Sequence, residues 1–562
     1  MKILGINYFG HDASAALVVD GKVVSAVEEE RFSRTKHDSA FPELSINYCL
    51  ENSNLSLADI DAVALSFIPE KWIQGGFLAY SEAYFPDSIP LLQSKVKLLE
   101  LYADFENHVR GQLKYDGEIV FKRHHECHFA SCYYLSGFTD SALMSLDGSG
   151  EYQTMLLGYG KDQKMDNLQE TLLPHSVGYL YDAVCVYLGF NYKTGAGKVM
   201  GLASYGDPKP YQDVFEQIVT IDQTNGTFRL DMDYFEFHKR RDVWVSDKLI
   251  EALGPAHNPE HKLGKRQFDI AASLQQCTEE IGLNAARYLN KTTGSKNVCM
   301  AGGVSLNCVM NGRILKETSF ENIFVQPAAG DAGTAIGAAL LHYYDENPQA
   351  PLGPRLEHSY HGPAYSDETI LEVLKQYPVN VTEPDSVEEK TASHIKEGKI
   401  IGWFQGNMEF GPRALGNRSI LSAPFPAEMK DILNERVKHR EWFRPFAPAI
   451  LEEYLEDYFD CGHITPYMLL VYNILEHKKA DIPATVHVDG TGRVQTVSKD
   501  QNPKFYNLIK EFQKKTGIPV ILNTSFNVQG EPVVCTPKDA VKCFLGTEID
   551  VLVLGNYIVY KK

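Results

Sequence analysis

A pair of histidines four residues apart, His124 and His128, is the clearest candidate for metal chemistry in the sequence. On an α-helix, side chains at i and i+4 project from one face, so both imidazoles can bind one ion. Two histidines rarely complete a site, and two carboxylates stand beside glycines downstream, Asp147 and Asp331. This ligand set, with an open position, suits Fe(II), Mn or Zn. The alternative is that the histidine pair is an ordinary hydrogen-bonded feature of a helix.

Cationic residues in the C-terminal part of the chain predict a binding site for a polyanion. They lie in loops bounded by glycine or proline near predicted strand ends, and the candidates are Arg413, Arg418, Lys438, Arg440 and Arg493. The planar guanidinium group of arginine binds phosphate through paired hydrogen bonds. Solvated surface arginines are the alternative. The mixed-charge run at residues 28–37, which contains Lys36, is also a candidate for anion binding, although such runs are usually solvated faces.

Glycine-rich loops at strand ends indicate where a backbone can approach a ligand. A buried strand at residues 297–300 leads to Gly302, Gly303 and Asn307, and paired glycines before a helix make room for a nucleotide at the helix N-terminus. The pattern returns at once, with a strand at 323–325, a glycine loop and a helix at 334–343. A further glycine-rich stretch, residues 195–206, would let the backbone approach a ligand closely, but its spacing is not that of a P-loop.

The elements that must position these residues predict an α/β protein. Strands are expected at residues 2–7, 14–19 and 22–26, with an Asp-Gly hairpin turn between the last two. A second strand–Asp/Gly–strand unit at 142–159 suggests an internal duplication, with coincidence between two ordinary hairpins as the alternative. Downstream, strands alternate with helices, which places the ligand at the carboxyl ends of the strands.

Length, composition and charge narrow the class of protein. A chain of 562 residues is too long for one core and predicts two or three units. The segment 346–363 contains several prolines and little periodicity, so the boundary is predicted there, giving domains at 1–355 and 356–562. A net charge of −19 opposes nucleic acid or anionic membrane as partners. Cysteines without a Cys-x-x-Cys pair and the lack of an apolar leader predict a cytoplasmic protein.

Taken together, the motifs resemble the O-carbamoyltransferases of antibiotic and nodulation-factor biosynthesis, the NodU/TobZ type, along nearly the whole chain. The matching stretches are Gly10–Ser14, Glu28–His37, His124–His128, Asp147–Gly148, Gly197–Gly201, Gly302–Asn307, Gly330–Gly333, Gly411–Ser419, Lys438–Glu441 and Asn523–Asn527. The resemblance implies a duplicated actin-like (ASKHA) domain, similar to the metal-containing tRNA threonylcarbamoyl transferase. It implies a smaller YrdC-like α/β domain after it. The tRNA-modifying relatives use a tyrosine as metal ligand where Asp147 is the equivalent here, which argues against a tRNA substrate.

The same resemblance implies a reaction in two steps. The C-terminal domain of such enzymes makes carbamoyl adenylate from carbamoyl phosphate and ATP, with Mg accompanying the ATP. The N-terminal domain passes the carbamoyl group to the hydroxyl of a small-molecule alcohol in the biosynthesis of an antibiotic or toxin. Fe(II) is the favoured metal there, and a homodimer is one option for the assembly.

Residue roles follow from this resemblance together with the chemistry. His11 is the predicted base, because a histidine titrates near neutrality, although a packed turn histidine is the alternative. Lys438 and Arg440 are the predicted catalytic residues of the adenylating step. The predicted contacts to nucleotide or carbamoyl adenylate are Lys36, Gly302, Gly303, Asn307, Arg413, Arg418, Lys438, Arg440, Arg493, Ser525 and Asn527. The competing functions are a small-molecule kinase on the actin-like fold and an inactive nucleotide-binding scaffold.

Overall fold

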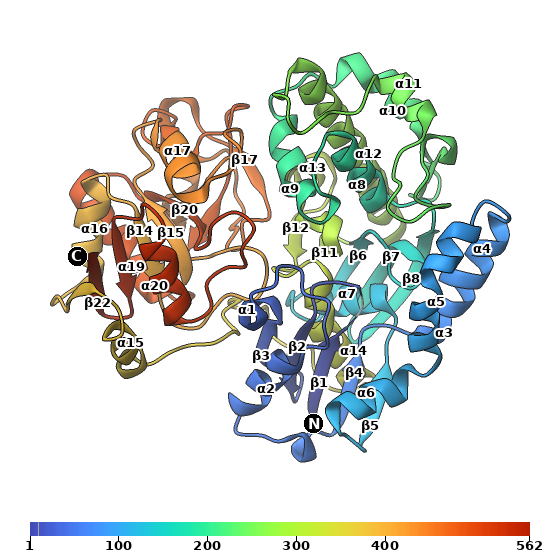
Figure 1. The fold of residues 1–562 in the computed structure, drawn as a ribbon, viewed down its shortest axis with the longest axis horizontal. Helices are drawn as coiled ribbons and strands as arrows, with labels where there is room; N and C mark the ends of the chain where they lie inside the picture. The colour runs from blue at the N-terminus through green and yellow to red at the C-terminus, as the bar shows by residue number, and fades with distance from the viewer. Residues whose placement is uncertain (9) are drawn as a thin grey trace. The chain divides into compact units, whose positions relative to one another are not determined.

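The computed structural model describes residues 1–8 and 10–562 of the chain (Figure 1). It divides into two compact units, of which the first comprises Met1–Ala26 and Ser39–Leu356. The second comprises Val27–Asp38 and Glu357–Lys562. A short segment near the start of the chain therefore belongs with the C-terminal unit, which no feature of the sequence predicts.

The first unit contains two five-stranded sheets. The first sheet has the order β3-β2-β1-β4-β5. Strand β1 is antiparallel to β2 and parallel to β4, which in turn is parallel to β5. Alternating short apolar runs with an Asp-Gly turn give the predicted first three strands, and the bounds are β1 Lys2–Asn7, β2 Ser14–Val19, β3 Lys22–Glu28, β4 Ala62–Leu65 and β5 Glu118–Phe121.

The second sheet repeats this plan. Its order is β12-β11-β6-β7-β8, so that β6 takes the place of β1. Strand β6 is antiparallel to β7 and parallel to β11, and β11 is parallel to β12. The bounds are β6 Asp140–Leu146, β7 Gln153–Lys161, β8 Lys164–Leu172, β11 Asn297–Ala301 and β12 Asn322–Val325. The shared order and strand directions confirm the duplicated, actin-like α/β fold predicted for this unit.

Two helices, α7 (His124–Tyr133) and α14 (Thr334–Glu346), lie between the two sheets at the centre of the first unit (Figure 1). Helix α14 packs on β1, β2 and β4 and against α7, which packs on β6 and β11. The helices approach so closely that a Cβ atom on Gly337 would lie 1.9 Å from the carbonyl oxygen of Cys127. Only glycine fits at this contact.

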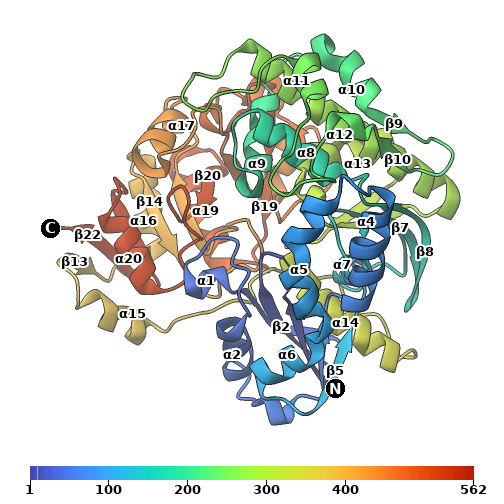
Figure 2. The same ribbon diagram turned by 45° about the vertical axis from the view of Figure 1, so that its right-hand side comes forward.

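A helical subdomain of the first unit packs around the long helix α12 (Figure 2). Residues 195–203 of the glycine-rich stretch belong to helix α9, and a close approach of their backbone to a ligand stays a prediction. Gly195 lies where its Cβ would be 3.1 Å from the Cβ of Cys185 on α8, so this glycine serves helix packing. The bounds are α8 Val177–Tyr187, α9 Tyr192–Ala203, α10 Gln212–Ile218, α11 Asp247–Leu253, α12 Lys265–Thr293 and α13 Cys308–Glu317, with β9 Val219–Ile221 and β10 Phe228–Leu230 between them.

Among the remaining helices of the first unit, α2 packs on β2 of the first sheet. A π-helical turn at Trp72–Ala79 lies between α3 and α4, and its Trp72 ring contacts Tyr102 of α5, which contacts Phe105 of α6. The bounds are α2 Glu43–Glu51, α3 Pro69–Lys71, α4 Tyr80–Ala83, α5 Ile89–Ala103 and α6 Phe105–Leu113. Among the residues that the structure describes, no helix is both long and apolar enough to cross a membrane.

The second unit is built on an eight-stranded mixed sheet of order β13-β22-β21-β14-β15-β20-β16-β19. Its central strands β14, β15, β20 and β21 are largely buried, as their apolar sequences predict. The bounds are β13 Val379–Thr382, β14 Ile401–Phe404, β15 Arg418–Ser422, β16 Ala447–Leu451, β19 Gln495–Val497, β20 Val520–Ser525, β21 Val551–Leu554 and β22 Tyr557–Lys561. A two-stranded sheet, β17 Val471–Asn473 and β18 Thr491–Arg493, lies beside it.

Helices cover both faces of this sheet. Helix α19 runs from Pro503 to Thr516 and buries Phe505, Leu508, Ile509 and Phe512. Lys438 ends a π-helical turn at Leu433–Lys438, and the residues after it are irregular. The other bounds are α1 Glu30–Ser33, α15 Asp367–Leu374, α16 Val387–Lys396, α17 Met429–Ile432, α18 Leu455–Tyr458 and α20 Pro537–Leu545.

Candidate functional site

The four predicted metal ligands come together in the first unit. His124 and His128 lie in the first turns of α7, Asp147 follows β6, and Asp331 begins a short 3-10 helix before α14. Both histidine side chains are 0% exposed, and the carboxylates of Asp147 and Asp331 are 11% and 6% exposed. Both carboxylates follow strands of the second sheet, β6 and β12, and they lie at the start of the helix that carries the imidazoles.

The ligand atoms are spaced as a shared divalent cation requires. Nε2 of His124 lies 3.1 Å from Nε2 of His128, and Oδ2 of Asp147 lies 3.4 and 3.1 Å from these two nitrogens. Oδ1 of Asp331 lies 3.5 and 3.8 Å from the same nitrogens. Bonds of about 2.0–2.2 Å to one ion place neighbouring ligands roughly 3 Å apart. The site therefore fits a metal held by two imidazoles and two carboxylates.

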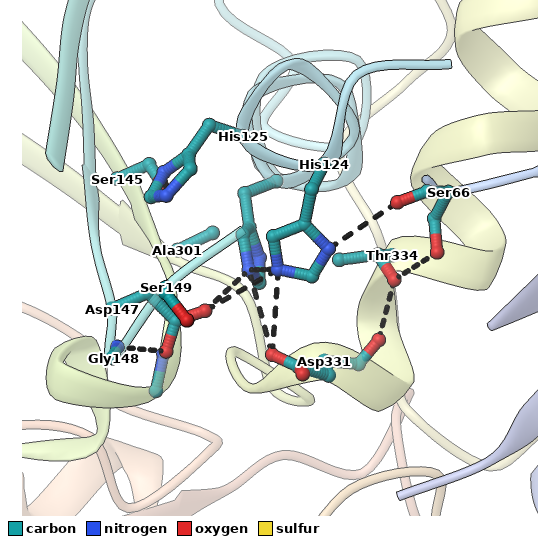
Figure 3. A network of polar contacts seen from close by, with 12 residues as sticks. Ser66, His124, His125, Ser145, Asp147, Gly148, Ser149, Ala301, Asp331 and Thr334 are labelled. Atoms are coloured by element: carbon teal, nitrogen blue, oxygen red, sulfur yellow. Dashed lines mark hydrogen bonds and ion pairs between the residues drawn. The ribbon is translucent and has the colours of Figure 1, made fainter. Parts of the chain in front are cut away.

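A hydrogen-bond network orients His124 within this site (Figure 3). Its Nδ1 lies 3.3 Å from the carbonyl oxygen of Ser66, so Nδ1 carries the proton and Nε2 keeps its lone pair for the ion. The Thr334 hydroxyl lies 2.8 Å from the Ser66 hydroxyl and 2.6 Å from the carbonyl oxygen of Asp331. Partners of this kind raise metal affinity by fixing the ligands in place.

The paired glycines Gly302 and Gly303 shape the loop that holds Asp147. The N–H of Gly303 donates to Oδ1 of Asp147 at 3.1 Å, and that of Gly148 donates to the same atom at 2.8 Å. This leaves Oδ2 for the metal. Gly302 has φ +90°, and a Cβ there would lie 2.1 Å from the carbonyl oxygen of Leu146. The two glycines thus support the metal site, and their role as nucleotide contacts stays a prediction.

Asn307, the other predicted nucleotide contact in this unit, has its amide engaged within the protein. Its Oδ1 accepts from the N–H of Met310 at 3.1 Å and caps α13. The same amide pairs with that of Gln275 through two hydrogen bonds of 3.0 Å. A nucleotide contact by Asn307 remains a prediction that these bonds do not support.

Glu151 anchors the metal-binding helix and was not predicted. Its side chain is buried, and Oε1 accepts the backbone N–H groups of His124 and Ile68, both at 3.0 Å. It thereby caps the start of α7 and ties it to the segment that contains Ser66. Burial raises the pKa of Glu151. In the sequence, Glu151 is an acidic residue four positions after Asp147. No sequence pattern there indicates that its carboxyl group is buried.

His11, the predicted base, lies at the edge of the metal site. Its Nε2 is 3.8 Å from Oδ2 of Asp331, and its Nδ1 is 2.9 Å from Oδ2 of Asp12. Burial by itself lowers the pKa of His11, but Asp331, Asp12 and Asp147 outweigh it and raise the pKa to about 10. A protonated imidazole accepts no proton. The base role therefore requires a cation at Asp147 and Asp331 to offset their charge.

Two side chains of α8, Tyr179 and Asp182, approach the same site and were not predicted. The hydroxyl of Tyr179 lies 2.8 Å from that of Ser149. Burial raises the pKa of Asp182 to about 7, with His11 lowering it and Asp147 raising it. Residues three apart share a helix face, so both side chains point the same way. Only the packing of α8 brings them to the site, so the sequence alone gives no signal.

In the second unit, the predicted residues Lys438, Ser525 and Asn527 come together. Nζ of Lys438 donates to the backbone carbonyls of Ser525 and Asn527 and to Oδ1 of Asn527, all at 2.8 Å. The lysine is 3% exposed and ends the π-helical turn, a feature often found at functional sites. The end of β20 is therefore fastened to this turn.

Arginines lie close to this lysine, and the carboxylate of Glu441 offsets part of their charge. Burial lowers the pKa of Arg440, and the neighbouring charges of Arg444 and Arg493 lower it further. Burial also lowers the pKa of Lys438, to which Arg440 and Arg444 add. Arg444 was not among the predicted contacts, although it lies in the same cationic loop. Cations that destabilise one another's charge favour binding of a polyanion.

Arg418, predicted to contact the nucleotide, is buried within the protein instead. Its side chain is 0% exposed, and its guanidinium donates to the carbonyls of Gln405 at 2.6 Å and Pro363 at 2.8 Å. The same group lies over the ring of Phe404 at 3.7 Å. These bonds to backbone oxygens do not support a direct ligand contact by Arg418, which stays a prediction.

The other predicted cations are more open. Arg413 is half-buried in the loop between Gly411 and Arg418, and Lys36 is exposed. The charge of Lys36 contributes to the lowered pKa of Lys438, which places the two near each other within the second unit. Their contacts to nucleotide or carbamoyl adenylate stay predictions.

Two protein-family models match the chain. The model described as carbamoyltransferase N-terminus matches residues 2–340, and the one described as carbamoyltransferase C-terminus matches residues 392–561. The first match covers more than half of the 562 residues. The metal ligands lie in the first matched region, and Lys438, Ser525 and Asn527 lie in the second.

Three relatives show how far the similarity extends. The chain is 39% identical to an uncharacterised protein of Synechocystis, over 100% of this chain and 96% of the relative. It is 40% identical to nodulation protein NolNO of Sinorhizobium fredii, over 99% of this chain and 80% of the relative. An uncharacterised protein of Methanocaldococcus jannaschii is 30% identical over 100% of both chains.

Proposed function

Because the chain belongs to the carbamoyltransferase family, we propose that it is an ATP-dependent O-carbamoyltransferase. In the second unit, carbamoyl phosphate and ATP react to form carbamoyl adenylate. In the first unit, the carbamoyl group passes to a hydroxyl of a small-molecule acceptor of secondary metabolism. The observation that carries this proposal is the cluster of Lys438, Arg440, Arg444 and Arg493, in which neighbouring positive charges lower the pKa of Lys438 and Arg440.

The cationic cluster supports the adenylating step on physical grounds. Carbamoyl phosphate and ATP bring several negative charges together, and each repels the other. Buried arginines offset that repulsion and stabilise charge that develops at the α-phosphate in the transition state. Magnesium would accompany ATP as the further counter-charge. In the net step, carbamoyl phosphate, ATP and water give carbamoyl adenylate, phosphate and pyrophosphate.

The metal site supports the transfer step. An acceptor hydroxyl attacks the carbamoyl carbon, the bond to the AMP oxygen breaks, and the products are the carbamate ester, AMP and one proton. His11 would take that proton, since it lies beside the ligand Asp331. His124, His128, Asp147 and Asp331 would hold the divalent metal, which supplies Lewis-acid chemistry when bound. We infer Fe(II) from the resemblance, with Mn and Zn compatible with the same ligands.

A small molecule is the acceptor class that the protein favours. The net charge of −19 opposes binding of a polyanion as large as tRNA outside the local cationic cluster. Asp147 occupies the ligand position, and the aromatic rings of Tyr179, Phe237 and Trp244 contact one another beside Ser149. Apolar rings near reactive polar groups are usual in small-molecule sites.

Substitution of the two catalytic cations tests the adenylating step. Lys438→Ala and Arg440→Ala should each lower carbamoyl-phosphate-dependent pyrophosphate release by about 10²–10³-fold, as expected for loss of a charged contact to the transition state. Metal content should not change. Arg436→Ala is the matched control, because Arg436 lies in the same π-helical turn but is 58% exposed and pairs with Glu548.

The products separate this function from its competitors. A mass gain of the acceptor equal to HNCO, together with AMP, supports carbamoyl transfer. ADP with a phosphorylated acceptor would identify a kinase instead, and nucleotide binding without turnover would identify an inactive scaffold.

A further inference from the structure

The segment Val27–Asp38, here called the strap, carries a buried ion-pair network. Nε and Nη2 of Arg31 donate to the carboxylate of Glu28 at 3.2 and 3.0 Å, and Nη1 lies 2.8 Å from Oε1 of Glu30. Arg31 is 3% exposed and Glu28 is 5% exposed. Replacing a buried pair of this kind by apolar side chains is often neutral or stabilising. Stability alone therefore does not account for the network.

The network holds one particular loop of the second unit. Oε1 of Glu28 accepts the N–H of Gly411 at 3.0 Å, and Nη2 of Arg31 donates to the carbonyl of the same residue at 3.0 Å. Both backbone groups of Gly411 are thus fixed by the strap. Gly411 has φ +120°, a conformation that favours glycine, and it begins the loop that contains Arg413.

A second arginine of the strap holds a second loop. The guanidinium of Arg34 donates to the carbonyls of Val533 at 2.7 Å and Pro532 at 2.8 Å. The carbonyl of the preceding residue, Glu531, accepts a hydrogen bond from Nδ2 of Asn527 at 2.7 Å. Asn527 in turn binds Lys438. Arg34 is therefore linked through one short loop to the lysine of the cationic cluster.

An apolar contact fastens the strap between these two loops. Phe32 packs against a buried cluster formed by Met408, Val533 and Cys535. Met408 precedes the loop that Arg31 holds, and Val533 belongs to the loop that Arg34 holds. The strap thus touches both loops by hydrogen bonds and by packing, and it also carries Lys36, whose charge acts on Lys438.

We propose that the strap is a positioning element of the adenylating site, with Arg31 and Arg34 as its positioning residues. Arg31 fixes the loop that presents Arg413, and Arg34 fixes the loop that orients Asn527 and Lys438 toward carbamoyl phosphate. This inference rests on the proposed function. It extends that function by assigning part of the C-terminal site to a segment of the N-terminal sequence.

Arg34→Met in the full chain is the first test, because it removes two donors to backbone oxygens without leaving a buried carboxylate unpaired. We expect the KM for carbamoyl phosphate in pyrophosphate release to rise about 10- to 100-fold, as a small misplacement of binding groups causes. Bound metal should be unchanged. Arg31→Lys keeps the charge but not the paired geometry, and should raise KM by a smaller factor.

Arg110→Met is the matched control. Arg110 lies in the first unit and likewise donates to two backbone carbonyls, those of Tyr115 at 3.3 Å and Gly117 at 2.9 Å. A lower melting temperature with wild-type KM in both strap variants would overturn the inference, and so would an equal rise in KM for Arg110→Met. If Arg34→Met does not fold, the KM of Arg31→Lys is compared with that of Arg110→Met. A higher KM for Arg31→Lys supports the inference, and an equal KM overturns it.

Failure of the proposed function is distinguishable from failure of this inference. Wild-type protein without carbamoyl-phosphate-dependent turnover would refute the function. Calorimetric titration with inorganic pyrophosphate would then decide the role of the strap. Weaker binding by Arg34→Met than by Arg110→Met supports it, and equal binding overturns it.

Discussion

At the scale of single residues, charge decides which groups around the metal site are able to react. His11 is held protonated by three carboxylates, whereas burial keeps Asp182 from ionising readily. A divalent cation at Asp147 and Asp331 would offset two of the charges that act on His11. In the proposed mechanism, metal binding and the ability of His11 to accept a proton are therefore coupled through Asp147 and Asp331.

Removal of a metal ligand should abolish transfer but leave the adenylating step. Loss of a residue that only hydrogen-bonds to a metal ligand typically weakens metal binding by about 10- to 100-fold. We expect His124→Ala and Asp331→Ala, which remove ligands themselves, to weaken it by more than this. Elemental analysis of the purified variants measures this. His125→Gln is the control, because His125 is equally buried beside His124 but bonds to Ser145 and the carbonyl of Gln153. Full metal content in His124→Ala would contradict the assigned site.

Asp182→Asn should stabilise the first unit at neutral pH. The folded-state pKa of about 7 lies above the ordinary value, so the native state loses stability as pH rises from about 4 to about 7 and Asp182 ionises. The asparagine variant has no such loss. Its gain over wild type should therefore grow between about pH 5 and about pH 8, by about 1–2 kcal/mol after allowing for solvent screening. Urea unfolding at both pH values measures the gain, and a pH-independent difference would contradict the assignment.

The predicted residues that come together in the structure lie in motifs with a recognisable spacing. His124 and His128 stand one helical turn apart, and Lys438 and Asn527 belong to short motifs. Glu151, Asp182 and Arg444 have no such spacing, and they reach the sites only through packing of whole elements. For Arg418, the motif position does not reveal that the side chain is buried.

At the scale of elements, close contact between α7 and α14 sets the position of the metal ligands. Gly337→Ala should destabilise the first unit by about 1–3 kcal/mol or more, since the added Cβ would lie 1.9 Å from the carbonyl of Cys127. Gly197→Ala is the matched control. Gly197 lies within α9 with no atom within 4 Å of the added Cβ, so alanine should stabilise there by about 0.5–1 kcal/mol. Thermal unfolding of both variants tests this, and equal melting temperatures would contradict it.

Most strands and long helices followed from hydrophobic periodicity. Short apolar runs predicted Lys2–Asn7 and Ser14–Val19, and the helix at Pro503–Thr516 has proline at its start and glycine after its end. The helix at Tyr192–Ala203 and the π-helical turn at Leu433–Lys438 were not predicted, because glycine is common in loops as well as in closely packed helices and a π-helical turn has no distinctive hydrophobic period.

At the scale of the whole molecule, the two units are not two consecutive pieces of sequence. Residues 27–38 belong with the second unit although more than 300 residues separate them from Glu357 in the chain. Long-range placement of this kind depends on tertiary contacts, which local patterns do not contain. A fold could be predicted for each half, but the packing of residues 27–38 within the second unit could not.

A fragment of residues 357–562 should therefore be less stable and less active than the second unit within the full chain. Without the strap, Gly411 loses both of its partners, and Met408, Val533 and Cys535 lose the packing of Phe32. We expect a synthetic peptide of residues 27–38, added in trans, to raise the melting temperature and to restore pyrophosphate release in part. A peptide with Phe32→Ala and Arg34→Met should restore less. A fragment that is fully stable and active alone would contradict this expectation.

Arg31 and Gly411 are 380 residues apart in the chain, so they are synthesised at different times. At a synthesis rate of about 5–20 residues per second, roughly 20–80 s pass between the appearance of one partner and the other. During this interval the strap has been synthesised, but the loop at Gly411 that it contacts has not. The proposed adenylating site is consequently among the last parts of the protein to mature. Under the proposed function, a chain that terminates before Gly411 would release no reactive carbamoyl intermediate.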